Sequence, residues 1–223
     1  SDILECAYAA HGDTKHILLF PSTPKECFEM TADAFDLTEK LQTPVILMTD
    51  LDLGMNDHIS APLVWDDSRK YQRGKVLSHE QLENMSEKYG RYLDVDGDGI
   101  PYRTIPATHE TKGAFVTRGS SREEYAVYTE DSAAYQRNME RLVKKFETAK
   151  ELVHAPEFYQ TENASKNGVI FFGTSTYSAE EAIELLKNEG ITLDAMRPKA
   201  FPFGKEFVEF VNAHSKVFVI EQN

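Results

Sequence analysis

The stretch HILLFPSTPKECFEMTADAFDLTEKLQTPVILMT, residues 16–49, decides the fold of this chain. It has a short apolar run at each end and a segment with helical periodicity between them. Thr23 and Glu26 have the spacing of a capping box, and Pro24 suits the first position of a helix. Because a strand-helix-strand crossover brings its two strands together in parallel, the stretch predicts a β-α-β unit.

Two long amphipathic helices are expected, one inside this stretch and one over roughly 131–153. A shorter helix is expected to begin at Ser78, which has capping-box spacing to Gln81, and to end at Gly90. The helical spacing also predicts which side chains of the two long helices face the core. These are Cys27, Phe28, Thr31, Phe35, Thr38 and Leu41 on the first helix, and Tyr135, Met139, Leu142, Phe146 and Val153 on the second.

The last third of the chain alternates strands with helices, which predicts a second, small parallel α/β unit. Ser178 and Glu181 have capping-box spacing at the start of its first helix. The polar stretch before this unit is the predicted linker, so the chain divides into 1–153, 154–167 and 168–223. The predicted strands are 168–173, 191–196 and 217–221, and the predicted helices are 178–189 and 205–213.

The composition limits the functions that are open to the chain. It has 223 residues, of which 41% are hydrophobic, and a formal net charge of −13. A polyanion attracts neither nucleic acid nor anionic lipid, and the apolar runs are far shorter than the ~20 residues that cross a bilayer. We therefore expect proteins and small molecules as partners. Cys6 and Cys27 are too few for a disulfide framework, which favours a cytoplasmic protein. They are also too few to hold an iron–sulfur cluster.

The two ends of the chain do not have the pattern of natural termini. Ser1 is not preceded by an initiator Met or a signal peptide, and Asn223 directly follows a predicted strand. We therefore expect the chain to be a fragment of a longer protein, cut at both ends.

Several segments, taken in order, resemble one known family. His11-Gly12-Asp13, the strand to Phe20-Pro21, the helix that follows and Gln42-Thr43-Pro44-Val45-Ile46 resemble one stretch of the α subunits of 2-oxoacid:ferredoxin oxidoreductases. Residues 98–103 and 125–131 look like the connecting segment that comes next in that family, and 168–223 is similar to its transketolase-C-like domain. The resemblance covers nearly the whole chain, and the 2-oxoglutarate synthase branch looks most similar.

The resemblance implies a fold and a reaction. The fold class is α/β, with the C-terminal half of a thiamine-diphosphate pyrimidine-binding domain followed by a parallel α/β domain of transketolase-C type. In the assembled enzyme, thiamine diphosphate with Mg²⁺ would support oxidative decarboxylation of a 2-oxoacid, such as 2-oxoglutarate, to acyl-CoA, with the electrons passing to ferredoxin.

The resemblance also implies which parts lie elsewhere. A β subunit, which carries the pyrophosphate and magnesium site and an iron–sulfur cluster, and a second α subunit are the implied partners. The glutamate that activates the thiamine ring lies upstream of the stretch that Ser1 begins. We therefore expect this chain alone to bind no cofactor and to have no catalytic residue or activity of its own.

Arg103 is the candidate substrate-binding residue because a guanidinium can hold a carboxylate with two parallel hydrogen bonds. The resemblance places the matching arginine over the thiamine site, with Thr108 as a hydroxyl donor nearby. The alternative is that Arg103 pairs with the aspartates of residues 94–98 in a structural network.

Three further candidates follow the C-terminal end of a predicted strand, where open α/β sheets bind ligands. Asp50, Asp52 and Gly54 are expected in a loop near the cofactor or at a subunit interface. His11 and Asp13 lie at the opposite end of their strand, which favours a turn or subunit contact over an acid–base pair. The loop 173–176 precedes a helix and could bind an anion, although a tight β-α connection is the simpler interpretation.

Asp94, Asp96 and Asp98 are candidate metal ligands, since carboxylates at positions 1, 3 and 5 with Gly99 at position 6 match the start of an EF-hand loop. Position 12 is Ile105, so the bidentate carboxylate is missing. Residues 97–99 also resemble the start of a thiamine diphosphate magnesium motif, without its later asparagine. A structural turn is favoured over a weak cation site. A calcium-stabilised, non-catalytic interaction module is the alternative function.

Overall fold

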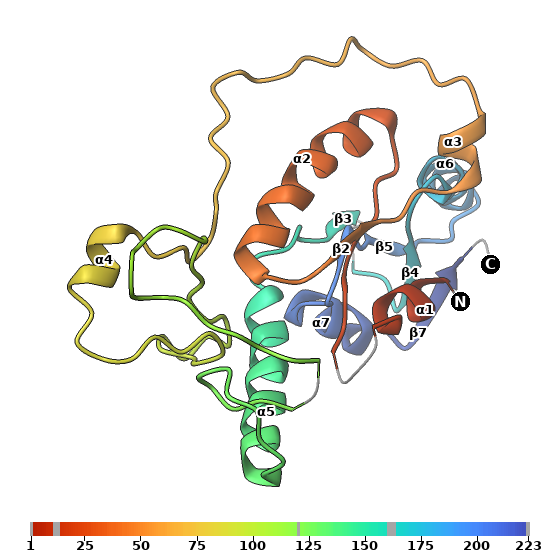
Figure 1. Ribbon diagram of the computed structural model, residues 1–223. Helices are drawn as coiled ribbons and strands as arrows, with labels where there is room; N and C mark the ends of the chain where they lie inside the picture. Colours follow the sequence, from red (N-terminus) through yellow and green to blue (C-terminus); the bar gives the residue numbers. More distant parts are fainter. Residues whose placement is uncertain (1, 11–13, 120, 160–163, 222–223) are drawn as a thin grey trace.

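The computed structural model describes residues 2–10, 14–119, 121–159 and 164–221. The chain forms two separate β-sheets, which lie near the centre of the molecule with helices around them (Figure 1). The first sheet has three strands in the order β2-β1-β6, and the second has four in the order β3-β5-β4-β7. The prediction that the two strand groups belong to different sheets is confirmed.

The first sheet contains the predicted β-α-β unit. β1 (Ile17–Leu19) runs parallel to β2 (Val45–Leu47), and α2 (Pro24–Leu41) connects them. β6 (Ala200–Phe201) adds to β1 in the antiparallel direction. The sheet is therefore mixed, and one of its strands comes from the predicted C-terminal unit.

The second sheet holds the strands predicted in the last third of the chain. β4 (Asn167–Phe171) lies between β5 (Asp194–Arg197) and β7 (Lys216–Ile220), and both run parallel to it. β3 (Glu157–Tyr159) pairs with β5 in the antiparallel direction. Residues 157–159 are thus an edge strand and not part of a linker, while the predicted boundaries at 153 and 168 remain predictions.

Two hydrophobic layers cover the two faces of the first sheet. Because side chains alternate along a strand, Ile17 and Leu19 face α2 and α5 (Ser132–Ala149), whereas Leu18 and Phe20 face α1 (Asp2–Tyr8). The second sheet is packed in the same way between α6 (Ser175–Asn188) and α7 (Lys205–Ala213).

The predicted inward faces of the two long helices were wrong in part. On α2 the buried residues are Met30, Ala32, Leu37 and Leu41, and Phe35 is exposed. The predicted face instead contacts a later segment, where Trp65 packs edge-on against Phe28 with ring centroids 5.9 Å apart. On α5, Phe146 is buried as predicted, whereas Tyr135 is exposed; the other buried residues are Ala134, Asn138, Lys145 and Ala149.

Other predicted boundaries are shifted. α6 begins at Ser175 with Thr174 as its N-cap residue, so Ser178 lies inside the helix and does not cap it. The capping box of Ser78 and Gln81 is confirmed, but the helix it starts, α4 (His79–Glu83), ends well before Gly90. α7 has the predicted bounds.

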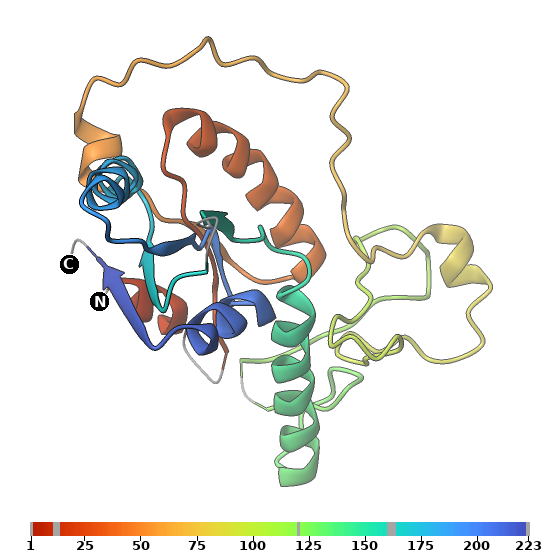
Figure 2. The ribbon, with the colours of Figure 1, turned by 180° about the vertical axis from the view of Figure 1, so that it is seen from behind.

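A long segment leaves the body of the molecule after α3 (Leu51–Met55) and arches over α2 in both views (Figures 1 and 2). Residues 59–64 of this arch make no hydrogen bond to the body in the described part of the chain. Its side chains Ile59 and Val64 are exposed. Among the described residues no helix combines the length and apolar character that a membrane span requires.

Candidate functional site

The C-terminal ends of β2 and β4 meet at one carboxylate, that of Asp50. The Oδ2 atom of Asp50 accepts hydrogen bonds from the backbone N–H of Thr174, at 2.8 Å, and from its hydroxyl, at 2.7 Å. The Oδ1 atom accepts one from the N–H of Leu53, at 2.9 Å, and so caps α3. Asp50 therefore joins the helix that follows β2 to the helix that follows β4.

Gly173 is the residue that makes this approach possible. Its φ is +61°, which favours glycine, and a Cβ atom there would lie 2.8 Å from Oδ2 of Asp50. Thr174 is itself buried. The group at this helix N-terminus is thus a side chain of the protein itself, the carboxylate of Asp50, in the tight β-α connection that was the favoured interpretation of residues 173–176.

The hydrogen bonds at Asp50 also decide its ionisation. Partial burial by itself would raise the pKa of Asp50, but the hydrogen bonds from Thr174 and Leu53 outweigh burial and lower the pKa. The carboxylate is therefore ionised at neutral pH. Asp52 lies beside it and accepts a longer hydrogen bond, 3.3 Å, from the hydroxyl of Thr174. Gly54 lies within α3, and its Cβ position faces open space.

A pocket of about 270 Å³ opens at this edge of the two sheets. Its lining comes from both sheets, and from α1 as well. The ends of parallel strands are where open α/β sheets bind ligands, and the volume is near the lower limit for a small-molecule site. The lining residues are Asp2, Ile3, Met48, Thr49, Asp50, Leu51, Phe172, Gly173, Ser175 and Glu221.

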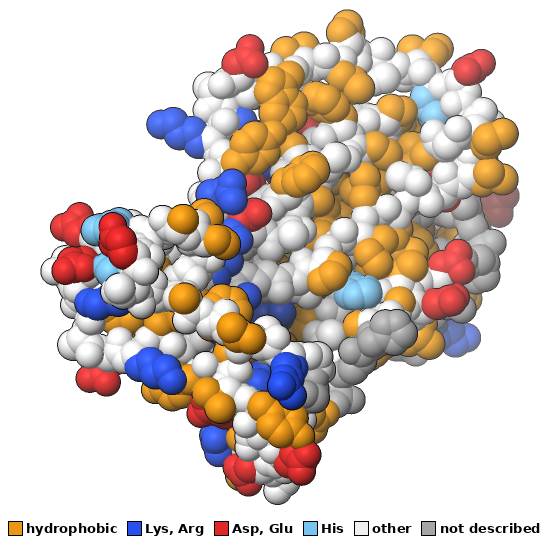
Figure 3. Space-filling view, in the orientation of Figure 1, with side chains coloured by type: hydrophobic (Ala, Val, Ile, Leu, Met, Phe, Trp, Pro, Cys, Tyr) orange, Lys and Arg blue, Asp and Glu red, His pale blue; other side chains and the backbone are white. Residues whose placement is uncertain are grey.

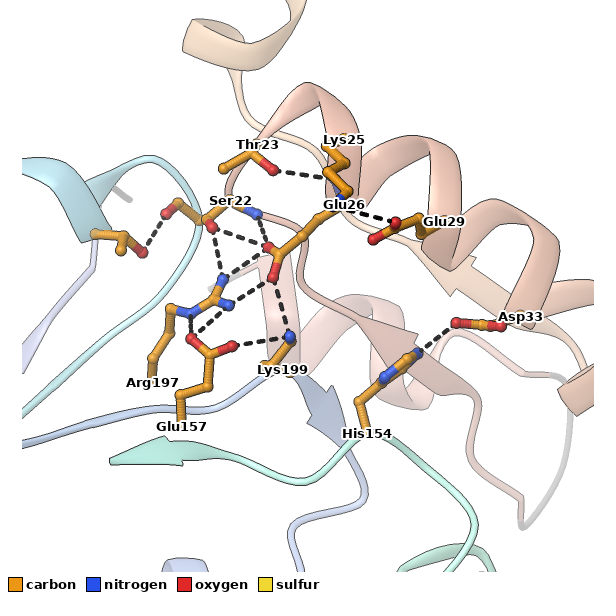
Figure 4. A network of polar contacts seen from close by, with 12 residues as sticks. Ser22, Thr23, Lys25, Glu26, Glu29, Asp33, His154, Glu157, Arg197 and Lys199 are labelled. Carbon is orange, nitrogen blue, oxygen red and sulfur yellow. Dashed lines mark hydrogen bonds and ion pairs between the residues drawn. The ribbon is translucent and has the colours of Figure 1, made fainter. Parts of the chain in front are cut away.

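A second junction between the sheets is a network of charged side chains around Arg197 (Figure 4). The guanidinium of Arg197, which is 3% exposed, lies between Glu26 of α2 and Glu157 of β3. Its distances to the two carboxylates are 2.7 and 2.8 Å, and Lys199 contacts both carboxylates at 3.0 Å. The side chain of Ser22 also donates to Glu26 and accepts from Arg197.

Arg103 lies on a short bridge with residues 75–77 and turns its side chain toward α2. Its backbone N–H donates to the backbone carbonyl of Lys75, at 2.9 Å. Its guanidinium contacts the carboxylate of Glu39 and donates to the carbonyl of Arg73. The side chain is 23% exposed. Arg103 is therefore neither fully buried nor paired with the aspartates of residues 94–98, and the carboxylate beside its guanidinium is that of Glu39.

Thr108 lies in a different place from the guanidinium of Arg103. It lines a pocket of about 430 Å³ formed by residues 104–109 and 112–115, and Arg103 is not among the lining residues. The backbone N–H of Thr108 donates to the carbonyl of Ile105, at 3.2 Å. The structure thus brings Asp50 and Asp52 together but does not bring Arg103 and Thr108 into one pocket.

The Asp/Gly loop is closed by protein groups. Both oxygens of Asp94 accept backbone N–H groups, from Asp98 at 3.1 Å and from Gly99 at 3.0 Å. The ammonium of Lys75 lies 2.7 Å from Asp96 and 2.8 Å from Asp98. Lys75 therefore stands where a bound cation would be, which supports the interpretation of this loop as a structural turn.

Sequence reasoning did not identify Thr174, Arg197 or Lys75 as partners of the candidate residues. Thr174 had a usable signal, because anion binding was one of the two interpretations of the loop 173–176, although a tight β-α connection was favoured. Arg197 and Lys75 had no such signal, because their partners are distant in the sequence. Glu26 lies 171 residues from Arg197, and Asp98 lies 23 residues from Lys75. His11 and Asp13, considered as an acid–base pair, lie outside the described residues.

Comparison with known proteins gives one family and several relatives. Residues 1–112 match the family described as pyruvate flavodoxin/ferredoxin oxidoreductase, thiamine diphosphate-binding. A 2-oxoacid:ferredoxin oxidoreductase α subunit from Aeropyrum pernix is 29% identical over all of this chain, which covers 34% of that protein. A 2-oxoglutarate synthase subunit KorA from Methanothermobacter marburgensis is 25% identical, and here the chain covers 57%.

A solved structure shares the fold. The 2-oxoglutarate:ferredoxin oxidoreductase of Magnetococcus marinus, with 2-oxoglutarate, coenzyme A and succinyl-CoA bound, superposes with a TM-score of 0.84 and 24% identity. The match covers all of this chain and 38% of that one. The chain thus spans between about a third and just over half of the length of these relatives.

Proposed function

Because the chain belongs to the pyruvate flavodoxin/ferredoxin oxidoreductase family, we propose that it is part of the α subunit of a 2-oxoacid:ferredoxin oxidoreductase. The reaction would be the oxidative decarboxylation of a 2-oxoacid to acyl-CoA, with 2-oxoglutarate as the substrate and ferredoxin as the electron acceptor. The observation that carries the proposal is the match of the whole chain, end to end, to subunits of such enzymes.

The chain's own residues supply few groups for the cofactors. The family is thiamine diphosphate-binding. However, Lys75 already pairs with both Asp96 and Asp98, so the Asp/Gly loop does not fit a magnesium–pyrophosphate site. We therefore assign Mg²⁺, the pyrophosphate and the iron–sulfur cluster to residues of a β subunit. The same contacts leave the calcium-stabilised interaction module without support.

We assign two kinds of role to the candidate residues. Arg103 would hold the carboxylate of the 2-oxoacid after exchanging it for Glu39, and Thr108 would donate a hydroxyl from the neighbouring pocket. Asp50, Asp52 and Gly54 would form the loop near the cofactor or the subunit interface. The hydrogen bonds of Asp50 to the Gly173–Thr174 loop support this second role, because they hold the edges of both sheets together.

We also propose that the arch, residues 56–66, contacts a β subunit or a second α subunit. An extended segment with exposed apolar side chains, which over residues 59–64 makes no hydrogen bond to the described part of its own body, is typical of a chain that packs on a partner. Figure 3 shows hydrophobic side chains gathered over the upper part of the molecule, where the arch passes over α2. We place the assembled enzyme in the cytoplasm, in keeping with the two free cysteines, Cys6 and Cys27.

The assembled enzyme offers the direct test. It should reduce ferredoxin or a viologen dye only when 2-oxoacid, CoA, thiamine diphosphate and Mg²⁺ are all present, and fastest with 2-oxoglutarate. Arg103→Ala should raise the KM for the 2-oxoacid by ~10-fold or more, because a bidentate ion pair to substrate is lost, while the KM for CoA changes little. Glu39→Ala, which frees the guanidinium, is the matched variant and should lower the KM for the 2-oxoacid.

Two results would contradict the proposal at different levels. Absence of reduction with every 2-oxoacid tried would remove the proposed reaction. Equal rises in both KM values for Arg103→Ala would leave the reaction in place but remove Arg103 from the substrate site.

A further inference from the structure

Positive charge gathers at one point on this otherwise acidic chain. The guanidinium groups of Arg91, Arg122 and Arg141 all lie over the ring of Tyr92, at 5.5, 5.3 and 6.0 Å from its centroid. The formal net charge of the chain is −13, so this grouping is the reverse of the overall balance.

Lys145, whose side chain is largely buried, adds an ammonium to the same group. It lies one helical turn after Arg141 on α5 and is only 5% exposed. Within the described part of the chain no hydrogen bond or ion pair engages its Nζ atom, whose recorded contact is the ring of Phe146, 5.5 Å away. Burial, together with the charges of Arg141 and Arg91, lowers the pKa of Lys145 to about 8.

The two arginines nearest to Lys145 are also poorly matched by acids. Arg91 has no hydrogen bond among the described residues, and Arg141 donates from Nη1 to the carbonyl of Gly99, at 3.0 Å, while its buried Nε has no partner. Asp94 is the carboxylate whose charge reaches Arg141, but backbone N–H groups occupy both of its oxygens. Burial lowers the pKa of Arg141 as well.

Backbone packing holds these groups in place. Gly99 has a φ of +80°, and a Cβ atom there would lie 2.3 Å from the backbone N of Lys145 and 2.6 Å from the carbonyl oxygen of Arg141. The loop 94–99 therefore presses directly on the turn of α5 that carries both cations. Like charges held together out of water cost free energy unless an opposite charge joins them.

We propose that Arg91, Arg141 and Lys145 bind a phosphate group, either a phosphate ester or a pyrophosphate. Two guanidinium forks and one ammonium match the several oxygens and the double negative charge of a tetrahedral phosphate. A carboxylate would neutralise only one of the three cations. This site goes beyond the proposed function, because it needs neither the 2-oxoacid reaction nor any residue assigned to it above.

The test is calorimetric titration of the purified protein with inorganic phosphate and with pyrophosphate, at constant ionic strength set with chloride. Lys145→Met keeps the length of the side chain and removes its charge. Lys144→Met, on the exposed side of the same turn, makes the same change in net charge and is the control. Lys145→Met should weaken phosphate binding by about tenfold or more, since a charge-assisted contact is lost, and Lys144→Met should leave it nearly unchanged.

Thermal unfolding adds a second measurement, in which Lys145→Met should stabilise the protein although it weakens phosphate binding. In phosphate-free buffer, Lys145→Met should raise the Tm, because the charge on a largely buried side chain beside two arginines is removed, and the same variant should lose the rise in Tm that phosphate gives the unaltered protein. Equal phosphate affinities in the two Met variants would overturn the proposal, and so would the absence of phosphate binding to the unaltered protein.

A third titration distinguishes free phosphate from a phosphate carried by a coenzyme. Coenzyme A is the probe, and this arm alone rests on the proposed function. If Lys145→Met weakens coenzyme A binding by the same factor as phosphate binding, the site holds a phosphate of the coenzyme. If coenzyme A binding is unchanged while phosphate binding is lost, the site is one for the free anion. If Lys145→Met loses neither phosphate binding nor coenzyme A binding, the proposal is overturned.

Discussion

Arg197 shows how a single side chain can couple two sheets. It projects from β5 of the second sheet and reaches Ser22 and Glu26 at the start of α2, which belongs to the first. Thr23 caps α2 as predicted, accepting the N–H of Glu26 at 3.0 Å. The carboxylate of Glu26, however, accepts from the N–H of Ser22, at 2.8 Å, as well as from Arg197. The capping-box spacing therefore located the helix start, whereas the partner of Glu26 came from another part of the chain.

The first prediction concerns the buried guanidinium. Arg197→Met should lower the free energy of unfolding by roughly 3 kcal/mol, because Glu26 and Glu157 would lose their main counter-charge while remaining partly buried. Lys25→Met removes an exposed i,i+4 ion pair with Glu29 and should cost at most ~0.5 kcal/mol. Urea denaturation of the two variants compares them. Similar losses would mean that the Arg197 network adds little to stability.

The second prediction follows from the ionisation of Glu26. Burial alone would raise its pKa, but hydrogen bonds from Arg197, Ser22 and Lys199 outweigh burial and hold the pKa well below the usual carboxyl range. A lowered folded-state pKa stabilises the fold above the ordinary carboxyl pKa of about 4.3, and this contribution is lost as the pH falls toward the folded-state value. Stability should therefore fall less steeply below about pH 4.5 in Glu26→Gln than in the unaltered protein.

Exposed Glu29, on the next turn of α2, provides the matched control for this pH series. Glu29→Gln should leave the slope of stability against pH nearly unchanged. If the two Gln variants have the same slope, the ionised form of Glu26 is not what stabilises the junction.

At the scale of elements, the helices show what amphipathic patterning resolves. α2 has apolar side chains on two faces, because one face packs on the first sheet and Phe28 of the other contacts Trp65 of the arch, whose ring stacks on Tyr71. Periodicity identified the helix but could not choose between the faces. α5 buries Lys145 and Asn138, residues that a hydrophobic pattern assigns to the surface, so its inward face was predicted incorrectly for Tyr135.

The third prediction concerns the junction of α3 and α6. Asp50→Asn should lower the free energy of unfolding by about 1–2 kcal/mol. The carboxylate accepts from the N–H groups of Leu53 and Thr174 with one oxygen each, whereas an amide has a single acceptor oxygen and can keep only one of these contacts. Hydrogen exchange of the Thr174 amide should accelerate in this variant. Asp52→Asn is the control, since its contact with Thr174 is the longer one at 3.3 Å. If Asp52→Asn lowered the free energy of unfolding by as much as Asp50→Asn, Asp50 would not be the residue that joins α3 to α6.

At the scale of the whole molecule, the two α/β units are interleaved. β6 comes from the C-terminal half but pairs with β1, and Phe201 and Phe203 pack in the same cluster as Leu18 and Phe20. Asp50 and Arg197 link the two sheets at two further points. We therefore expect the two halves to unfold together, because removing either one would expose the hydrophobic cluster they share.

The fourth prediction concerns the arch. In the full α subunit, replacing Ile59 and Val64 together with Glu should weaken assembly with its partner subunits, because two exposed apolar side chains would be lost from the proposed interface. The melting temperature of the isolated α subunit should hardly change, since both side chains are exposed in the chain by itself. Size-exclusion chromatography of the mixed subunits measures the first effect. Normal assembly of the double variant would show that the arch does not contact a partner.

The sequence by itself determined the local elements and the family. The β-α-β unit of residues 16–49, the caps at Thr23 and Ser78, and the helix of residues 205–213 were predictable because each depends on residues close together in the chain. Periodicity and capping are local properties, and a family resemblance adds up many of them. For the same reason Asp50 could be placed at the end of a strand before its partner was known.

Only the tertiary structure decided which distant groups meet. Glu39 beside Arg103, Lys75 within the Asp/Gly loop, Asp50 against Thr174 and the cations around Tyr92 all join residues with no local signal for each other. β3 and β6 are too short to show a period, so their pairing also depended on the sheets already being in place. The physical reason is the same in each case: charge and hydrogen-bond partners are chosen by proximity in space, which packing of the whole chain creates.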